Sequence, residues 1–428
     1  MRPPASFRPV GTTFTPTGSF VCRSCRLGRR PFSSATTAPP GPAIAASPPP
    51  PPSSGIARLS SRRLISVSGP DAAKYLQGVI TASITDPAGE ARRSGFYAAF
   101  LSAPGRVLHD VFVYPDTLGV ASSGGSGDAK LGESFLIEVD ADEAERLQKH
   151  IRRYKLRAKF AVRLLDPGEW SVWQAWDDGD PSTGGLASMA DATSPAGQQQ
   201  QQQHGIILRD PRLPALGYRL LAARDGPPPQ VDLAQAPESA YQIRRYLHGV
   251  PEGQDEVLRE QALPLEANMD AAGAIDFRKG CYVGQELTIR TKHRGVVRKR
   301  VLPCVLYAPE QAMPAELAYH PGIELASEPR PAGAENLPSG LSIGRVGKKG
   351  RSAGKWLKGV GNVGLALCRL EIMTDVVLPG ETASATYNPE DEFVIQERLD
   401  ADQVGQAFKI KAFVPLWLRQ GLNQTPHP

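Results

Sequence analysis

One short stretch divides this chain into two parts that are expected to fold differently. Residues 278–286 read Arg-Lys-Gly-Cys-Tyr-Val-Gly-Gln-Glu. Before this stretch, short apolar runs alternate with segments whose apolar residues recur every three or four positions, which predicts mixed strands and helices. After it, apolar runs such as 301–307 and 363–370 alternate with glycine and proline turns, which predicts an all-β domain, a small barrel or jelly roll. The sequence therefore predicts an α+β body, residues 56–300, and a C-terminal β domain, residues 301–428.

The composition is that of a globular protein with a basic leader. Hydrophobic residues make up 41% and charged residues 22%, and 428 residues are enough for about two or three domains. No window approaches the roughly 18 consecutive apolar residues of a transmembrane helix, so we expect no membrane span. The net charge is +5, but residues 1–70 contain nine arginines and no acidic residue, so the rest of the chain is net negative. The basic balance therefore gives no indication that the folded body binds nucleic acid.

Residues 1–55 have the features of an organellar leader. They are rich in arginine and serine and lack acidic residues, which is typical of a transit peptide that is removed on import. The proline-rich run 39–52 cannot form a regular helix and separates the leader from the first periodic segment. A basic tail that stays attached is the alternative. Cys22 and Cys25 form a Cys-x-x-Cys pair without a second ligand pair, so we interpret that spacing as coincidental.

Periodicity places the secondary structure of the chain. Asp71 is a predicted helix cap, and so is either Asp140 or Asp142. The second helix has an apolar stripe and an opposite basic face, which we expect to be solvated, with an anionic ligand or partner as the alternative. The stripe is Ala144, Leu147, Ile151 and Tyr154, and the basic face is Arg146, Lys149, Arg152, Arg153 and Lys155. A further helix is predicted at 238–247, and strands at 96–101, 107–114, 135–139, 160–165, 170–176, 206–208, 218–222 and 412–418. Residues 177–203, with six consecutive glutamines, predict a disordered surface insertion.

Three widely spaced cysteines remain after the leader: Cys281, Cys304 and Cys368. Three cysteines are too few for a self-contained four-cysteine cluster or zinc site. The organellar matrix to which the leader points keeps thiols mostly reduced, so we expect no disulfides. Cys304 and Cys368 fall in strand-like apolar runs and are predicted to be core residues. Cys281 differs because it follows two cations and lies between Gly280 and Gly284.

The neighbours of Cys281 suit a reactive thiol. Arg278 and Lys279 are expected to stabilise its thiolate, the form that binds metals or acts as a nucleophile. Gly280 and Gly284 permit backbone torsions that are closed to other residues, and they let a ligand or a second backbone come near. The alternative is a small buried side chain in a tight turn, since free cysteine is often buried.

Two motifs make the chain similar to a known family. Leu263-Pro264-Leu265-Glu266 precedes Lys279-Gly280-Cys281-Tyr282-Val283-Gly284-Gln285-Glu286 and Arg290. This combination resembles the signature of YgfZ-type proteins, relatives of the folate-dependent T-protein of the glycine cleavage system. Other segments between about residues 56 and 420 resemble the family in the same order: Tyr75–Gly78, Leu101–Asp110, Leu147–Lys159, Asp210–Arg219 and Gly361–Ala366. Together with the leader, the resemblance is to the mitochondrial branch, which assembles iron-sulfur clusters.

The resemblance implies a fold, partners and cofactors that the residue pattern alone does not show. It implies a T-protein-like arrangement of two interleaved α+β lobes and a C-terminal barrel around a central cavity. It also implies a mitochondrial matrix protein that acts with A-type scaffold proteins in late maturation of 4Fe-4S recipients, such as aconitase-like and radical-SAM enzymes. Tetrahydrofolate is an implied cofactor, with Glu266 and Arg106 as candidate binding residues. Cys281 is the candidate ligand of a transient iron-sulfur cluster shared with a partner.

Several motif residues have a second interpretation. Gln285 and Glu286 either face the cavity or cap the following helix and complement its dipole, and the capping interpretation is favoured. Glu266 is a candidate for hydrogen bonding to a pterin ring. The alternative is that it forms an ion pair with a purely structural role. His293 has no second histidine at metal-ligand spacing, so we expect it at the surface.

Three classes of function remain open at this point. The first is a non-enzymatic assembly factor, the second a folate-dependent aminomethyl transferase of the T-protein kind, and the third an RNA-binding protein that uses the basic segments 290–300 and 348–358. Where T-proteins carry Thr-Asn-Asp, this chain reads Thr81-Ala82-Ser83, and the loss of an amide and a carboxylate argues against aminomethyl transfer. The net negative body and the lack of interleaved aromatic residues argue against RNA. The sequence therefore favours the assembly factor.

Overall fold

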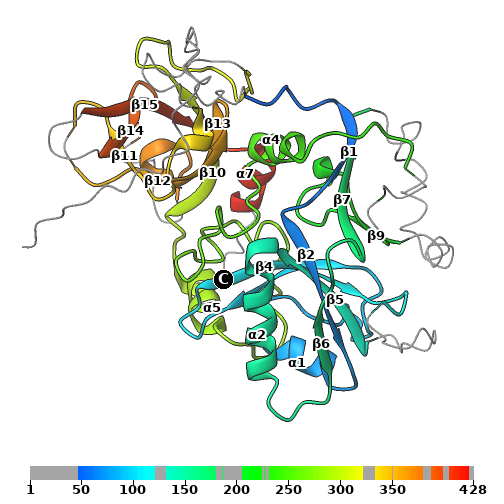
Figure 1. Cartoon of the computed structure of the whole chain (residues 1–428). Helices are drawn as coiled ribbons and strands as arrows, with labels where there is room; N and C mark the ends of the chain where they lie inside the picture. The colour runs from blue at the N-terminus through cyan, green and yellow to red at the C-terminus, as the bar shows by residue number, and fades with distance from the viewer. Residues whose placement is uncertain are drawn as a thin grey trace, which may run out of the picture. The chain divides into compact units, whose positions relative to one another are not determined.

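Three β-sheets organise the protein, and the order of their strands shows how the chain is interleaved (Figure 1). The computed structural model describes residues 47–120, 132–179, 186, 205–223, 226, 231–321, 333–348, 350–378, 387–398 and 404–423. All of them belong to one compact unit, residues 46–428. Most of the predicted leader, with Cys22 and Cys25, and most of the insertion predicted at 177–203 lie outside the described residues.

The first sheet is antiparallel and has the strand order β3-β4-β5-β2-β6. Its strands are β2 Arg62–Ser68, β3 Phe96–Leu101, β4 Val107–Pro115, β5 Ser134–Asp140 and β6 Ala161–Leu164. Its helices are α1 Ala72–Val79 and, after the 3₁₀ turn η1 Ala141–Glu143, α2 Ala144–Tyr154. Both helices pack on one face of the sheet, and a second apolar core covers the other face, so β3 and β4 are buried along their whole length.

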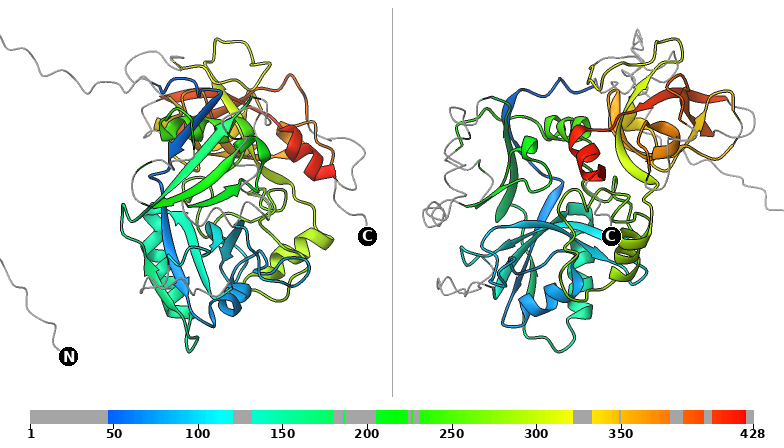
Figure 2. Two further views of the ribbon diagram at one scale, coloured as in Figure 1. Left: turned by 90° about the vertical axis from the view of Figure 1, so that its right-hand side faces the viewer. Right: turned by 180° about the vertical axis from the view of Figure 1, so that it is seen from behind.

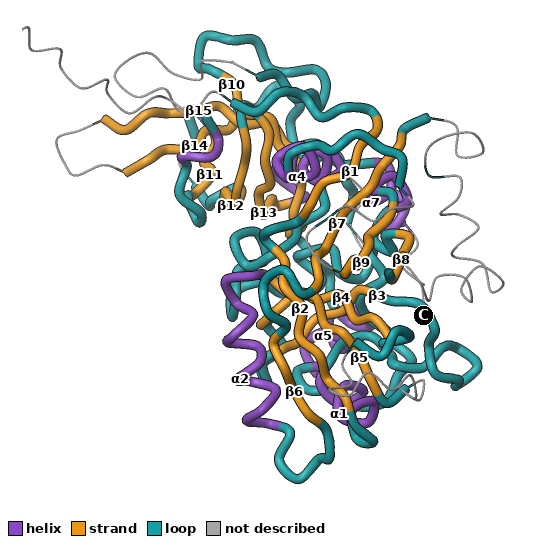
Figure 3. The backbone as a smooth tube through the Cα atoms, turned by 45° about the vertical axis from the view of Figure 1, so that its right-hand side comes forward, coloured by secondary structure: helices purple, strands orange, loops and turns teal. Residues whose placement is uncertain are grey.

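The second sheet, of order β1-β7-β9-β8, is interleaved with the first. Its strands are β1 Ser54–Arg58, β7 Trp170–Asp177, β8 Ile206–Arg209 and β9 Tyr218–Ala223, with the 3₁₀ turn η4 Pro214–Leu216 and the helix α4 Glu238–His248. The consecutive strands β1 and β2 belong to different sheets, and so do β6 and β7, so the chain crosses between the sheets twice (Figure 3). This is the interleaving of two α+β lobes that the resemblance implied.

The ends of the first two helices differ in part from the expectation. Asp71 precedes α1 without capping it, because its carboxylate instead accepts a hydrogen bond from the backbone N–H of Lys159 at 2.7 Å. Asp140 does act as a cap and accepts from the N–H of Asp142 at 3.0 Å. Tyr154 is 52% exposed, so the buried stripe of α2 ends one turn earlier than expected.

The C-terminal domain is a closed six-stranded barrel of order β10-β13-β12-β11-β14-β15 (Figure 2). Its elements are β10 Lys299–Tyr307, η5 Ala334–Asn336, β11 Ser342–Arg345, β12 Gly354–Val360, β13 Val363–Arg369, α6 Leu370–Met373, β14 Phe393–Arg398 and β15 Val404–Ala412. Cys304 and Cys368 lie in its core as expected, with their Sγ atoms 4.0 Å apart and both thiols free.

The apolar run at 412–418 is not a strand, which corrects the prediction. β15 ends at Ala412, and the helix α7 Leu416–Asn423 begins directly after Pro415, which suits a helix start better than a strand. The indole N–H of Trp417 donates to the carbonyl of His248 at 2.8 Å, so α7 lies against the end of α4 (Figure 1). Neither α7 nor any other described helix is long and apolar enough to cross a membrane.

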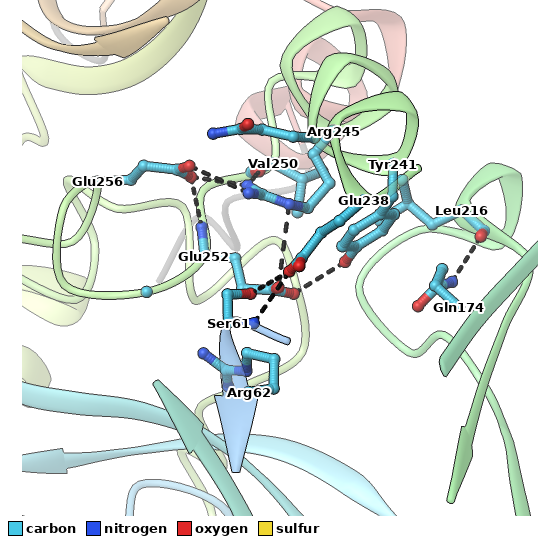
Figure 4. Close-up of polar contacts among 12 residues, drawn as sticks. Ser61, Arg62, Gln174, Leu216, Glu238, Tyr241, Arg245, Val250, Glu252 and Glu256 are labelled. Atoms are coloured by element: carbon cyan, nitrogen blue, oxygen red, sulfur yellow. Dashed lines mark hydrogen bonds and ion pairs between the residues drawn. The ribbon is translucent and has the colours of Figure 1, made fainter. Parts of the chain in front are cut away.

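A buried network of charged side chains joins the second sheet to α4 and the loop after it. Figure 4 shows the part of this network on α4 and the loop, with Tyr241, Arg245, Glu252 and Glu256. Its centre is Glu252, which accepts hydrogen bonds from Arg212 at 2.6 Å and from Arg219 at 2.5 Å. The Tyr241 hydroxyl of α4 donates to the same carboxylate at 2.8 Å. Burial by itself raises the pKa of Glu252, but the nearby guanidinium groups hold this pKa well below its usual range.

The same network reaches into the first sheet. Arg219 of β9 lies 3.6 Å from Glu138 of β5, and Arg62 of β2 donates to Glu138 at 2.8 Å. On the side of α4, Arg245 pairs with Glu256 at 2.6 Å. Because all these side chains are buried, each charge depends on its partner, and removal of one leaves another uncompensated.

We expect Glu252→Gln to lower the free energy of unfolding by about 3 kcal/mol, because the buried guanidinium groups of Arg212 and Arg219 then lose the carboxylate they share. Arg212 keeps only Asp210, and Arg219 keeps only the more distant Glu138. Urea unfolding of the full chain measures the change. Asp255→Asn is the matched control, since the Asp255 side chain is 74% exposed and its pair with Lys358 is a surface pair, so its effect should stay below about 1 kcal/mol. Equal losses in the two variants would contradict the central role of Glu252.

Candidate functional site

The loop that carries Cys281 is bound to the last turn of α1 and to the segment that follows it. The N–H of Asp276 donates to the carbonyl of Thr81 at 3.0 Å. Farther along the loop, the N–H of Val283 donates to the carbonyl of Gly78, also at 3.0 Å. Cys281 itself is exposed. The structure therefore presents this thiol to solvent on a loop that is held on both sides of it.

Lys279 points into the base of the loop. Its Nζ donates to the carbonyls of Ile80 and Ala82 at 2.7 and 2.9 Å, and it lies 5.0 Å from the centre of the Tyr282 ring. Burial lowers the pKa of Lys279 to about 8. The contacts of Lys279 are thus those of a residue that fixes the loop, and they do not include the expected stabilisation of the Cys281 thiolate.

Two glycines let the loop pack closely against the turn between β3 and β4. Gly284 has a φ of 79°, and a Cβ at this position would overlap the carbonyl oxygen of Ser102. The same Cβ would lie 3.2 Å from the Cα of Gly105, whose own φ is 84°. Gly280 has open space around it and no positive φ, so only Gly284 of the two motif glycines meets the conformational expectation.

The helix α5, Gln285–Arg294, begins directly after Gly284. The side-chain carbonyl of Gln285 accepts a hydrogen bond from the N–H of Tyr282 at 3.2 Å, so Gln285 closes the preceding loop. Glu286 is exposed in the first helical turn, where a carboxylate complements the helix dipole. Glu286 thus agrees with the predicted complement to the helix dipole, whereas Gln285 bonds to the preceding loop and does not cap the helix.

The remainder of α5 is largely exposed. Thr288 is its buried residue, whereas Leu287 and Ile289 are half-buried. Arg290 and His293 are exposed, and Arg290 makes no ion pair with any described residue. α5 therefore offers a long surface to solvent directly after Cys281.

Glu266 and Arg106 line one groove, of about 500 Å³, between the body and the barrel. We call it the body–barrel groove. Glu266 forms an ion pair with Lys299 at 2.8 Å, and Arg106 donates to the carbonyl of Gln261 at 2.5 Å. Its lining also includes the apolar Leu258, Val301, Leu357 and Leu367, the cations Lys355 and Arg369, and the carboxylates Glu256 and Glu260. The structure thus brings the two candidate folate residues together, and of the described residues that line this groove none belongs to the motif 279–286.

A smaller groove of about 240 Å³ lies along α5. It shares Leu263, Glu266, Lys299 and Arg369 with the body–barrel groove, so the two grooves are continuous. We call it the α5 groove. Its far wall includes Arg351 of the barrel, so it connects the motif helix with the C-terminal domain.

Residues 81–83 act as a support for the Cys281 loop. The Thr81 hydroxyl donates to the carbonyl of Ala274 at 2.6 Å and accepts from the N–H of Ala99 at 2.9 Å. The Ser83 hydroxyl accepts from the Gln77 amide at 3.3 Å. The side chains of this segment are thus engaged in structural hydrogen bonds.

Comparisons with known proteins relate the chain to proteins of iron-sulfur assembly. Residues 298–420 match the model of the CAF17 C-terminal beta-barrel domain. A Pyricularia oryzae protein named iron-sulfur cluster assembly factor IBA57 homolog, mitochondrial, is 58% identical over 411 residues, which cover 95% of this chain and 94% of the relative. A Neurospora crassa protein of the same name is 49% identical over 425 residues, which cover 95% of this chain and 89% of the relative. The chain belongs to the IBA57 family.

Membership of the IBA57 family confirms the predicted mitochondrial branch and the mitochondrial location. A solved structure, the glycine cleavage system aminomethyltransferase T from Bartonella henselae, resembles the fold with a TM-score of 0.53. It is 14% identical, and the match covers 86% of this chain and 87% of that one. This likeness confirms the T-protein-like α+β fold with a C-terminal barrel, and it concerns the fold alone.

The sequence did not reveal the residues that complete the two grooves of this IBA57-family chain. Arg351, Lys355 and Arg369 come from the barrel and meet Glu266 and α5 of the body only in the folded protein. The basic segment 348–358 contains Arg351 and Lys355 but not Arg369, and its composition does not indicate that these residues meet Glu266 and α5. Within the described residues, no group of three or more His, Cys, Asp and Glu side chains is arranged to hold a metal ion.

We expect Gly284→Ala to lower the free energy of unfolding by about 1 to 3 kcal/mol, since an alanine at this φ is strained and its Cβ would overlap Ser102. It should also change the rate at which Cys281 reacts with a thiol reagent, because the loop must shift. Gly280→Ala is the matched control in the same motif, and its open surroundings predict a change within about 0.5 kcal/mol. A larger effect at Gly280 than at Gly284 would contradict this account of the loop.

Proposed function

We propose that this IBA57-family chain acts late in the maturation of 4Fe-4S proteins in the mitochondrial matrix, together with A-type scaffold proteins. The observation that carries the proposal is the exposed Cys281, held on an anchored loop in a chain that matches iron-sulfur assembly factors over 95% of its length. The recipients are aconitase-like and radical-SAM enzymes.

Cys281 supplies one thiolate to a cluster whose remaining ligands come from the partner. Its exposure contradicts the interpretation of Cys281 as a small buried side chain, and it makes the sulfur accessible to a partner. When the sulfur binds iron, the thiol proton passes to solvent. Cys304 and Cys368 lie inside the barrel, where a partner cannot reach them. The cluster is cargo in this mechanism.

The body–barrel groove suits tetrahydrofolate. Glu266 offers a carboxylate that accepts paired N–H donors, as a pterin ring presents them. The apolar side chains of Leu258, Val301 and Leu357 offer flat contact to a ring system, while Arg106 and Lys355 offer cations to the carboxylates of a glutamate tail. When bound, tetrahydrofolate would either carry a one-carbon unit or act as a ligand through which the protein responds to the folate concentration. The chain's own residues bind and orient it.

The structure favours neither of the two other functions. Residues 81–83 offer no carboxylate for aminomethyl transfer, and their hydroxyls are engaged in structural bonds. The basic segment of the barrel is partly neutralised, since Lys348 pairs with Asp391 at 2.9 Å and Lys358 with Asp255 at 2.7 Å. An RNA-binding surface would leave such cations available for phosphates.

Cells depleted of this protein should lose aconitase activity while a 2Fe-2S protein stays active. Cys281→Ser should fail to restore aconitase although it folds, because the exposed thiolate ligand is lost. The control variant Cys368→Ala removes a thiol inside the barrel and should restore aconitase activity. We would measure the activities of aconitase and of the 2Fe-2S protein after complementation with each variant. Circular dichroism would check that each variant is folded. Normal aconitase combined with impaired glycine breakdown would favour a transferase, and full rescue by Cys281→Ser would contradict the ligand role.

Glu266→Gln should weaken tetrahydrofolate binding by roughly 10- to 100-fold, since a charged acceptor of two hydrogen bonds becomes neutral and half of it becomes a donor. Isothermal titration calorimetry on the purified full-length chain measures the affinity. Glu286→Gln is the control, because Glu286 is exposed on α5 and does not line the body–barrel groove. Equal affinity of Glu266→Gln and the unmodified chain would place folate elsewhere or exclude it.

A further inference from the structure

The α5 groove has an apolar floor and a cationic rim. The floor is formed by Leu263, Leu265, Leu287, Val296 and Val297. The rim carries Arg298, Lys299, Arg351 and Arg369. Glu266 is the one carboxylate among the described residues that line the groove, and it is already paired with Lys299 at 2.8 Å. Arg298 is also paired, with Glu371 at 3.1 Å. The excess of positive charge around the apolar surface therefore comes from Arg351 and Arg369.

Two of the rim cations lack a carboxylate of their own in the groove. Arg369 donates its Nε–H to the carbonyl of Ser352 at 2.9 Å, a neutral acceptor. The pKa of Arg369 is lowered by burial and then by repulsion from Arg351, and attraction by Glu371 and Glu266 offsets only part of this. Arg351 is exposed and forms no ion pair with any described residue. Two neighbouring guanidinium groups that repel each other at the rim of a groove are arranged to receive an anion.

Thr288 adds a polar group to this groove. It is 2% exposed, and its Oγ1 has no hydrogen-bond partner within the described part of the chain. Thr291, one turn later, uses its hydroxyl within the helix by donating to the carbonyl of Leu287 at 2.8 Å. A buried hydroxyl without a partner costs free energy, so the position suits a ligand that completes the hydrogen bond.

The size of the groove favours a protein segment as the occupant. About 240 Å³ is below the roughly 300 to 1,000 Å³ of typical small-molecule pockets, but it accepts one or two apolar side chains of a partner. The apolar floor then takes these anchors, and the rim pairs with carboxylates beside them. Because α5 begins just after Cys281, a partner seated here would have its own metal ligands close to that thiol.

We propose that the α5 groove docks an acidic, apolar-anchored segment of the partner that shares a cluster with Cys281. This inference rests on the proposed function, since it names the surface by which that partner binds. Docking in the groove is independent of the cluster itself: the apo partner binds through its acidic segment, and Cys281 acts only after docking.

The test measures the affinity of purified apo A-type scaffold protein for the full-length chain by isothermal titration calorimetry at low and high salt. Arg351→Glu should weaken binding roughly tenfold and reduce the salt dependence, because a like charge then faces the acidic segment. Arg153→Glu is the matched control, an exposed arginine on the basic face of α2, and it should leave the affinity unchanged. Cys281→Ser should also bind the apo scaffold with unchanged affinity.

Three outcomes would overturn the docking proposal. The first is that the scaffold protein binds Arg351→Glu as tightly as the unmodified chain, or that it does not bind the unmodified chain at all. The second is an equal loss with Arg153→Glu, which would mean non-specific attraction. The third is a loss of tetrahydrofolate affinity in Arg351→Glu with scaffold binding intact, which would assign the groove to a small anion. Docking that depends on Arg351, together with full cellular rescue by Cys281→Ser, would instead support the groove and contradict only the ligand role of the thiol.

Discussion

The ion network around Glu252 is the interaction on which the rest of the structure depends. Ionised side chains in a protein interior cost several kcal/mol each unless an opposite charge and hydrogen bonds compensate them. Here Glu252 joins Arg212 and Arg219, and Arg219 approaches Glu138 of the other sheet. The two sheets cannot slide past each other without separating these charges, so the points at which the chain crosses between them are fixed.

The network also positions the site, because the loop that contains Glu252 continues into the wall of the body–barrel groove. Glu256 lines the groove and pairs with Arg245. Farther on, the N–H of Glu260 donates to the carbonyl of Val107 at 2.8 Å, and the N–H of Val107 donates to Ala262 at 2.9 Å. The loop thereby becomes an edge partner of β4, next to the turn on which the Cys281 loop packs. Rigid packing therefore extends from the buried charges to the exposed thiol.

A thiol on a loop that is anchored in this way suits the transfer of a cluster between two proteins. Of the three cysteines among the described residues, Cys281 is the exposed one. An exposed helix follows it, and a cationic groove lies along that helix. A resident cluster would need its ligands within one chain, whereas cargo that passes between proteins needs an exposed ligand and a docking surface. In our proposals, the larger of the two grooves that share Glu266 binds a small ligand and the smaller one binds a partner.

The sequence by itself determined most strands and helices of the α+β body, the β character of the C-terminal part and the family. It singled out Cys281 by its neighbours but left open whether this thiol is exposed or buried. Local periodicity and a specific motif carry that information, because they report which neighbours along the chain share a face. Only the tertiary structure decided that Lys279 binds the loop base, that Gly284 rather than Gly280 needs its special torsion, and that Arg351 faces α5. Contacts of this kind join segments far apart in the chain, so they depend on which surfaces the sheets bring together and not on the spacing of residues.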